Sequence, residues 1–247
     1  MYQLPELLDF SEMVHAFSTK AEGNMDYRFG NKNQVMKNRR KFLSGLGISM
    51  DNCVFMSVQH GDTISEVDEN SKGLGVYTFE SALLNDALIT NIPNIYPVLL
   101  VADCAPIILY ERERKALALV HVGWKGADLK VIPKSIDMMK KIYNISLDKL
   151  VAGIGPAIRK NSYIKKDPQQ KNYPEWESYL KRIGKNKYEV NFVGYAVNQL
   201  IDSGVLEGNV FDSYIDTFHD DRFYSLTYES NLSLLDQGRF ACVVGLK

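Results

Sequence analysis

Cysteine is scarce in this 247-residue chain, and long apolar runs and an excess of charge are missing. The three cysteines, Cys53, Cys104 and Cys242, are an odd number without close spacing, which argues against a disulfide scaffold and predicts a reducing, cytoplasmic setting. Because the sequence has no long apolar span, we expect it to contain no membrane helix and no signal peptide. The formal net charge of −1 gives no reason to expect a nucleic acid or an anionic membrane as a partner.

The residues that are present predict a globular α/β chain. Hydrophobic residues make up 45% of the sequence, enough for a sizeable core, and no internal repeat or low-complexity linker divides it. We therefore expect one domain over residues 1–247. A polar, lysine-rich stretch around residues 165–187, with a short helix at 175–183, is interpreted as a solvated surface insertion.

Apolar patterning and turn residues place the main elements. The expected strands cover residues 13–18, 54–58, 151–154, 222–225 and 239–246, together with two central runs within 97–126. The expected helices cover residues 33–46, with Asn33 as N-cap and Gly47 as stop, 132–143, and 192–201, ending at Gly204.

The stretch 97–126 organises the chain, because its two apolar runs each carry one metal-binding residue type. If Tyr110 and Lys115 face each other across the turn, Cys104 lies directly opposite His121, with Cβ atoms roughly 5 Å apart. That separation suits two ligands of one metal ion. The turn lacks an Asn-Gly or Asp-Gly pair, so a three-residue loop would shift this register by one. Proline cannot donate to a strand ladder, so Pro106 is expected at an edge or at a bulge that redirects Cys104.

His60 is a candidate third ligand, because it ends the strand at 54–58 and precedes a glycine. A set of two histidines and one cysteine leaves a fourth position open, which is the catalytic rather than the structural zinc pattern. Two other interpretations stay open: three unrelated residues, or a Cys104 nucleophile with His121 as its base. The remaining histidines are expected to be a core residue, His15, and a surface residue, His219.

Arg39 is an anomaly in the helix at 33–46, because it falls on the apolar stripe formed by Val35, Phe42 and Leu46. A buried guanidinium needs a carboxylate, a phosphate or a pocket rim as its partner. The alternative is that its aliphatic stem passes the edge of the core and the charge reaches water. Further along, glycines around Trp124 let main-chain N–H groups approach a ligand, although they also occur in such turns for steric reasons.

Nine segments, in order along the chain, resemble a known family. They are FSTKAEG, Asn38-Arg39, VQHGD, DALIT, VADCAPIILY, ALVHVGWKG, GIGP, FYS and GRFACVVG. The chain is thereby identified as similar to the YfiH-type laccase-domain family, over residues 14–245. Members have been described as multicopper polyphenol oxidases and as zinc-dependent purine nucleoside phosphorylases with adenosine deaminase activity. The resemblance implies a single α/β domain with a mixed β-sheet layered with helices, the metal ligands His60, Cys104 and His121, and a substrate-site role for Arg39.

The sequence departs from the family pattern around the implied substrate pocket. Lys125 stands where the family usually has arginine, so bidentate anion binding becomes point-charge binding. The turn after GIGP reads Ala157 to Ile164 in place of the usual cysteines and Tyr-Glu pair. The segment Ser225 to Glu229 lacks the two arginines of the usual motif, which puts phosphate or substrate-anion contacts in question.

These features lead to the hypothesis of a zinc-dependent purine nucleoside phosphorylase acting on adenosine, inosine, guanosine or methylthioadenosine, with a potential adenosine deaminase activity. Arg39 and Lys125 are expected to offset the charge of phosphate. Copper is the less favoured metal, because four histidines are too few for three coppers. The alternatives are a copper polyphenol oxidase, a Cys104/His121 hydrolase, and a metal-binding protein that has lost turnover. The sequence does not indicate an oligomeric state.

Overall fold

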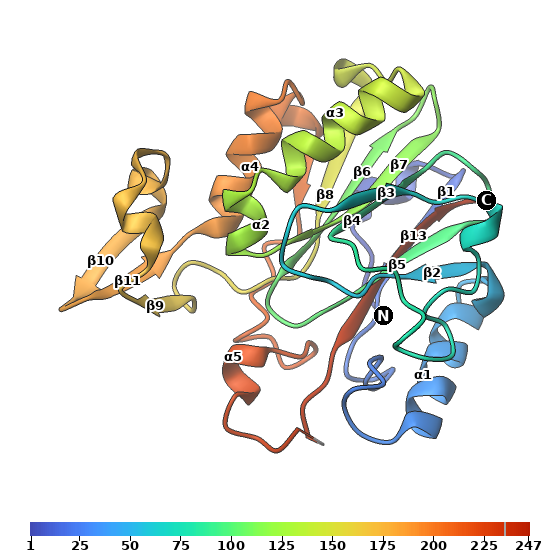
Figure 1. Cartoon of the computed structure of the whole chain (residues 1–247), viewed down its shortest axis with the longest axis horizontal. Helices are drawn as coiled ribbons and strands as arrows, with labels where there is room; N and C mark the ends of the chain where they lie inside the picture. The colour runs from blue at the N-terminus through green and yellow to red at the C-terminus, as the bar shows by residue number, and fades with distance from the viewer. Residues whose placement is uncertain (235) are drawn as a thin grey trace.

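The computed structural model describes residues 1–234 and 236–247. Two β-sheets pack face to face between helices (Figure 1). The helices are α1 (Lys32–Ser44), α2 (Trp124–Asp128), α3 (Val131–Tyr143), α4 (Phe192–Asp202) and α5 (Leu226–Glu229). The strands are β1 (Met13–Phe17), β2 (Cys53–Phe55), β3 (Ile64–Glu66), β4 (Ala87–Thr90), β5 (Tyr96–Val101), β6 (Ala105–Glu111), β7 (Ala116–Val122), β8 (Leu150–Ile154), β9 (Ile164–Lys166), β10 (Leu180–Gly184), β11 (Lys187–Val190), β12 (Val210–Asp212) and β13 (Phe240–Leu246).

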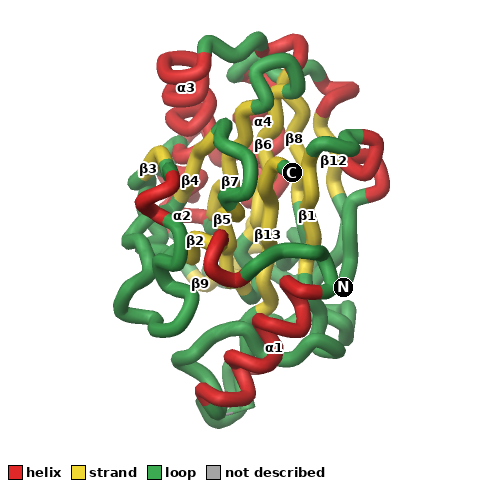
Figure 2. Tube along the Cα trace, turned by 90° about the vertical axis from the view of Figure 1, so that its right-hand side faces the viewer, coloured by secondary structure: helices red, strands yellow, loops and turns green. Residues whose placement is uncertain are grey.

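The layers follow helix, sheet, sheet, helix. The six-stranded sheet, in the order β12-β8-β6-β7-β4-β3, buries one face under α3 and α4 and the other against the four-stranded sheet β1-β13-β5-β2. The far face of that second sheet is covered by α1. Figure 2 shows α1 and α3 on opposite sides of the strands. The predicted single α/β domain is confirmed, with two main sheets in place of one.

The hairpin of β6 and β7 lies at the centre of the six-stranded sheet and is buried along its whole length. Alternate residues of the hairpin pack into two different hydrophobic cores. Ile107 and Val120 face the helices, whereas Ile108 and Leu119 face the second sheet. Because both faces are covered, the strands are apolar almost without interruption, as the sequence predicted.

The predicted register of this hairpin is wrong by two residues. His121 pairs with Pro106, not with Cys104, because the strands stay paired as far as Glu111 and Ala116. The buried Glu111 carboxylate accepts the main-chain N–H groups of residues 113 and 114 and closes a four-residue turn. A shift of two keeps every side chain on its face, so Cys104 and His121 still share one. Pro106 lies in regular pairing, and the predicted bulge is absent.

Helix boundaries match the sequence expectations closely, with one correction. The side chain of Asn31, not Asn33, caps α1 by accepting the N–H groups of residues 33 and 34. The helix ends at Ser44 and the chain leaves through Gly47, whose φ of +73° explains the glycine. Gly204, with φ of +97°, likewise follows α4. Among the described residues, no helix has the length and apolar character needed to cross a bilayer.

The lysine-rich segment forms a small three-stranded sheet, β10-β11-β9, that projects from the body (Figure 1). The short helix predicted at 175–183 is a 3₁₀ helix ending at Tyr179, and residues 180–184 form a strand. Its Trp176 is fully buried and packs on Tyr195 of α4 at a ring distance of 4.2 Å. The segment is therefore anchored to the core, which the interpretation as a solvated surface insertion did not anticipate.

The C-terminal part holds one closing strand, not two. β13 inserts between β1 and β5, as predicted for residues 239–246. The predicted strand at 222–225 is a loop, because Asp220 and Arg222 form a local ion pair and the Ser225 side chain caps α5 by accepting the N–H of Tyr228. That loop brings α5 to the cavity described below.

Candidate metal centre and substrate cavity

The structure brings the three predicted ligands together. His60 lies in the loop after β2, Cys104 directly precedes β6, and His121 is in β7. One ligand atom from each lies within 4.8 Å of the others, and the two imidazole rings stand at 89° with centroids 5.0 Å apart. His121 is buried, Cys104 half-buried and His60 exposed, so the cluster opens to one side.

Asp86 fixes the orientation of His121, and sequence reasoning missed it. Its Oδ1 lies 2.9 Å from His121 Nδ1, and its carbonyl oxygen accepts the His121 N–H at 2.7 Å. Its Oδ2 accepts the N–H of Gly61, beside His60. Because a carboxylate only accepts, His121 carries its proton on Nδ1 and leaves the Nε2 lone pair free for a metal. The signal in the sequence was an acidic residue at the start of the apolar strand β4.

Two backbone features allow the close approach of the ligands. His60 adopts a φ of +56°, which is uncommon for a residue with a side chain, and Gly61 follows it. A Cβ at Gly123 would stand 3.1 Å from Cys104 Sγ, closer than ordinary van der Waals contact. The missing side chain at Gly123 therefore leaves room for the Cys104 thiol, whereas the approach of main-chain N–H groups to a bound ligand stays a prediction.

Cys104 and His121 shift each other's pKa values, and His60 contributes to the shift of Cys104. Burial raises the pKa of the Cys104 thiol, but the imidazoles of His121 and His60 outweigh this effect and lower it to about 6. Burial lowers the pKa of His121, whereas the Cys104 thiolate and the Asp86 carboxylate raise it to about 9. The two shifts are mutual, because the charged form of each group favours the charged form of the other.

The donor set fits a zinc ion. Thiolate and imidazole are ligands that zinc accepts, and a histidine that donates its second N–H to a carboxylate is the usual arrangement around such a metal. Three protein ligands on the edge of a cavity leave a coordination position for water or substrate. The same three atoms also fit other soft or borderline metals, so the structure offers three candidate ligands without selecting one ion.

The cluster opens into a cavity of about 420 Å³. It is lined by His60, Ala102, Asp103, Cys104, Gly123, Trp124, Lys125, Ile158, Tyr163, Lys165, Phe192, Leu226 and Thr227. Lys125, predicted as a substrate residue, is therefore at this cavity, with its Nζ 5.5 Å from the Trp124 ring centroid. Aromatic and apolar walls with a few charged groups are typical of small-molecule sites.

Asp103 also lines this cavity, next to Cys104, although adjacent residues of a regular strand point to opposite faces. It precedes β6 and has a φ of +84°, so strand alternation does not apply to it. Its carboxylate accepts the Thr217 hydroxyl at 2.8 Å and the Thr227 N–H at 2.7 Å. Asp103 thus ties the C-terminal loop with the unusual Ser225 to Glu229 sequence to the edge of the metal centre.

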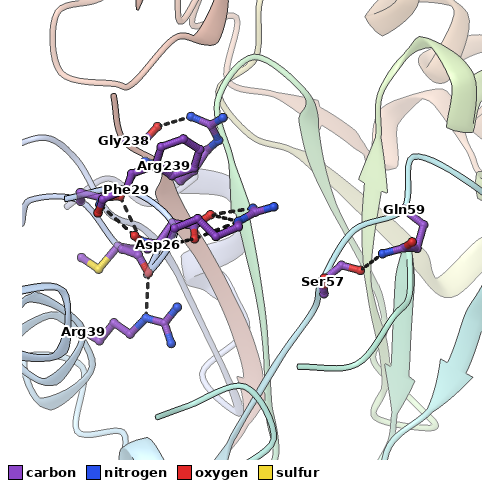
Figure 3. Close-up of polar contacts among 10 residues, drawn as sticks. Asp26, Phe29, Arg39, Ser57, Gln59, Gly238 and Arg239 are labelled. Carbon is purple, nitrogen blue, oxygen red and sulfur yellow. Dashed lines mark hydrogen bonds and ion pairs between the residues drawn. The ribbon is translucent and has the colours of Figure 1, made fainter. Parts of the chain in front are cut away.

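Arg39 is not brought to the cavity, and within the described part of the chain it is not among the lining residues. Its guanidinium donates to three main-chain carbonyl oxygens: those of Met25 (2.7 Å), Gly75 (2.8 Å) and Val76 (3.0 Å). The rings of Tyr27 and Phe55 cover it on both sides, each centroid 4.0 Å away. Figure 3 shows Arg39 reaching the turn that carries Asp26 and Phe29, with Arg239 on the other side of that turn.

The other two histidines lie where the sequence predicted. His15 is 1% exposed in β1, and its Nε2 accepts the Leu4 N–H at 2.9 Å. Burial lowers its pKa to about 4, so it is neutral in the fold. His219 is an exposed residue. Neither lines the metal cavity.

Together, the double-sheet fold and the His/Cys/His cluster define an α/β protein with a candidate metal site at the ends of central strands of the six-stranded sheet. The sequence profile described as multi-copper polyphenol oxidoreductase laccase matches residues 14–247, nearly the whole chain. The protein belongs to this family, and the resemblance inferred from the sequence is confirmed.

Relatives and solved structures agree with this assignment. An adenosine deaminase from an unknown prokaryotic organism is 26% identical over 84% of this chain and 87% of its own. A purine nucleoside phosphorylase of Staphylococcus saprophyticus is 24% identical over 85% and 79%, respectively. The Bacillus licheniformis protein YfiH superposes with a TM-score of 0.90 at 25% identity, covering 97% of this chain and 94% of that one. YlmD from Geobacillus stearothermophilus, at 22% identity, shares the fold with a TM-score of 0.89 over 96% and 93%.

Proposed function

We propose that this protein is a zinc-dependent purine nucleoside phosphorylase. It would convert adenosine, inosine, guanosine or methylthioadenosine and inorganic phosphate to the free base and ribose 1-phosphate. The observation that carries the proposal is the His60, Cys104 and His121 cluster at the floor of a cavity with aromatic walls. The names of the relatives, which include purine nucleoside phosphorylases and an adenosine deaminase, support the substrate class.

The metal ligands would be Cys104 Sγ, His121 Nε2 and one ring nitrogen of His60. A bound zinc ion supplies a Lewis acid that polarises an oxygen atom or lowers the pKa of a water molecule to about 7. Asp86 holds His121 in the tautomer that this requires. A metal ion binds the thiolate form of Cys104 and the neutral form of His121, so loading the site would be coupled to the release of protons.

The remaining residues of the cavity would bind and orient the substrates. Trp124, Tyr163 and Phe192 offer aromatic surface for a purine and exclude water from it. Lys125 would offset part of the negative charge of the attacking phosphate, as a point charge rather than a bidentate partner. In phosphorolysis the glycosidic bond breaks and a bond from C1′ to a phosphate oxygen forms. In the deaminase reaction, water replaces the purine amino group and ammonia leaves.

A cysteine hydrolase is the second candidate, and the lowered pKa of Cys104 favours it. Cys104, His121 and Asp86 are arranged as nucleophile, base and orienting acid. Thiol alkylation separates the two functions. If Cys104 is a metal ligand, stoichiometric zinc protects it from alkylation and a chelator restores its reactivity. Equal reactivity with and without zinc would favour the nucleophile.

The copper oxidase interpretation has less support from the site. A multicopper centre needs more imidazole ligands than this site offers, because the described residues bring His60 and His121 into the cluster, whereas neither His15 nor His219 lines the cavity. A metal-binding protein without turnover stays an alternative, because the loop with Ser225 to Glu229 departs from the family motif.

Product analysis tests the main proposal directly. Purified protein of known metal content is incubated with adenosine and with methylthioadenosine, with and without inorganic phosphate, and the products are separated by chromatography. We expect stoichiometric zinc and a release of adenine that depends on phosphate. Inosine formed from adenosine in either condition would demonstrate deamination. Fully zinc-loaded protein that produces neither adenine nor inosine would refute the proposal.

A further inference from the structure

A second cavity of about 290 Å³ adjoins the metal cavity and shares three of its lining residues, Trp124, Tyr163 and Lys165. The rest of its lining comes from residues 166–170 and Val190, which belong to the small sheet β10-β11-β9 and the turn after β9. Because the two cavities share a wall, a ligand bound at the metal centre can extend into the second one.

The metal cavity alone, at about 420 Å³, is within the range of roughly 300–1,000 Å³ found for small-molecule sites. A nucleoside therefore does not require the second cavity. The additional space suits a substituent that projects from the nucleoside away from the metal.

The charges along the two cavities indicate the chemistry of that substituent. Lys125 lines the first cavity, Lys165 lines both and Lys166 lines the second. In the described part of the chain, none of the three takes part in an ion pair. Asp167, the one acidic residue of the second cavity lining, is paired with Lys171. The two cavities together thus carry three ammonium groups outside these ion pairs, and Lys165 stands on the wall that they share.

The second cavity also has an ordered floor. Gln170 is 3% exposed and donates from Nε2 to Asp128 at 2.7 Å, which ties the cavity to the end of α2. On its rim, Lys165 Nζ lies 4.5 Å from the ring centroid of Tyr163. Ammonium groups next to a fixed floor match a phosphate, which lysine binds as a point charge.

We propose that the enzyme accepts nucleoside 5′-phosphates, with the nucleoside at the metal centre and the 5′-phosphate in the second cavity on Lys165 and Lys166. This inference rests on the proposed function for the substrate class. The glycosidic bond of the nucleotide breaks and C1′ bonds to an oxygen of inorganic phosphate, which yields the base and ribose 1,5-bisphosphate. The departing base keeps the bonding electron pair and takes the proton that hydrogen phosphate gives up.

The test compares adenosine 5′-monophosphate with adenosine as substrates of the zinc-loaded protein. We expect the Lys165→Gln, Lys166→Gln double variant to lower the ratio of kcat/KM for the nucleotide to kcat/KM for the nucleoside by about tenfold or more, because two charge-assisted contacts are lost. Lys185→Gln is the matched control. That residue is an exposed lysine between β10 and β11 of the same sheet and lines neither cavity, so the ratio should not change.

Two further measurements decide between the remaining outcomes. If the double variant instead raises the KM of inorganic phosphate and leaves the ratio unchanged, the lysines bind the attacking phosphate and the proposal is overturned. Calorimetric binding of adenosine 5′-monophosphate does not depend on turnover. Lysine-dependent binding without cleavage would reject the phosphorylase function and keep the second site. If the protein cleaves nucleosides but binds adenosine and adenosine 5′-monophosphate with equal affinity, the phosphorylase function is kept and the second site is rejected.

Discussion

The cavity has two walls of different construction. The metal wall consists of His60 and Cys104, which line the cavity, and of the buried His121 and Asp86 beside them. It joins the loop after β2 to the ends of β4, β6 and β7. Asp86 uses its carbonyl and both carboxylate oxygens to hold this wall. Several hydrogen bonds that also belong to the fold therefore fix the positions of the side chains in the metal wall.

The loop wall, formed by Ile158, Tyr163, Phe192, Leu226 and Thr227, is built from loops and helix ends outside the sheets. Its C-terminal part is held by the hydrogen bond from Thr227 N–H to Asp103 and by the ion pair of Lys20 with Glu229 at 3.2 Å. Two of the three departures from the family pattern, at residues 157–164 and 225–229, fall on this wall; the third, Lys125, lines the cavity beside Trp124, and none falls on the metal wall. We infer that metal binding and substrate choice can change independently in this fold, and four substitutions test that separation.

Replacing a ligand should have the largest effect. We expect Cys104→Ser to lose zinc and to lower turnover by about 10³-fold or more, the upper range for removal of one electrostatic group from a site. The measurements are metal content by mass spectrometry and the rate of adenine release. Cys242→Ala is the control, because Cys242 is fully buried in β13 away from the cluster and should keep its zinc. Full zinc content in Cys104→Ser would show that the thiolate is not a ligand.

Asp86→Asn should weaken the metal wall without removing a ligand. An asparagine can offer His121 Nδ1 an amide donor instead of an acceptor, so we expect zinc affinity to fall about 10- to 100-fold. Competition with a chelator measures the affinity. Asp62→Asn is the matched control, since Asp62 is a neighbouring surface residue paired with Lys134. An unchanged zinc affinity would mean that the strands alone position His121.

Asp103→Asn should affect the loop wall alone. The amide cannot accept both the Thr227 N–H and the Thr217 hydroxyl as the carboxylate does, so the loop loosens. We expect the KM for nucleoside to rise about tenfold, the typical cost of one charged hydrogen bond, with zinc content unchanged. Asp220→Asn, at a surface ion pair in the preceding loop, serves as control. Loss of zinc in Asp103→Asn would contradict the independence of the two walls.

The difference between the metal wall and the loop wall also explains which parts of the site could be predicted from the sequence. The ligands of the metal wall follow from residue type and strand position, because apolar runs and the alternation of side chains place Cys104 and His121 on one face. The register was wrong because the turn is closed by Glu111, a side chain whose role no turn motif announces. The error had no consequence for the site, since a shift of two preserves the face.

The partners of buried charges were harder to predict. Arg39 was correctly identified as a charge on an apolar stripe, but its partners are carbonyl oxygens of loops distant in sequence, and sequence periodicity does not contain that information. Asp86 was overlooked for the same reason, because its role depends on β4 pairing with β7. Long-range pairing, rather than local pattern, therefore decides what such residues do.

Lys125→Arg should have the smallest effect of the four substitutions, and it tests most directly whether substrate binding is separate from the metal wall. Lys125 is an exposed residue at the cavity, where the family usually has arginine. A guanidinium can bind phosphate in a bidentate manner, so we expect the KM for inorganic phosphate to fall by a few-fold, on the order of 0.5–1 kcal/mol, while the KM for nucleoside stays the same. Lys134→Arg, on the surface of α3, is the control. An unchanged phosphate KM would place the attacking anion away from Lys125, and a loss of zinc would tie this residue to the metal wall.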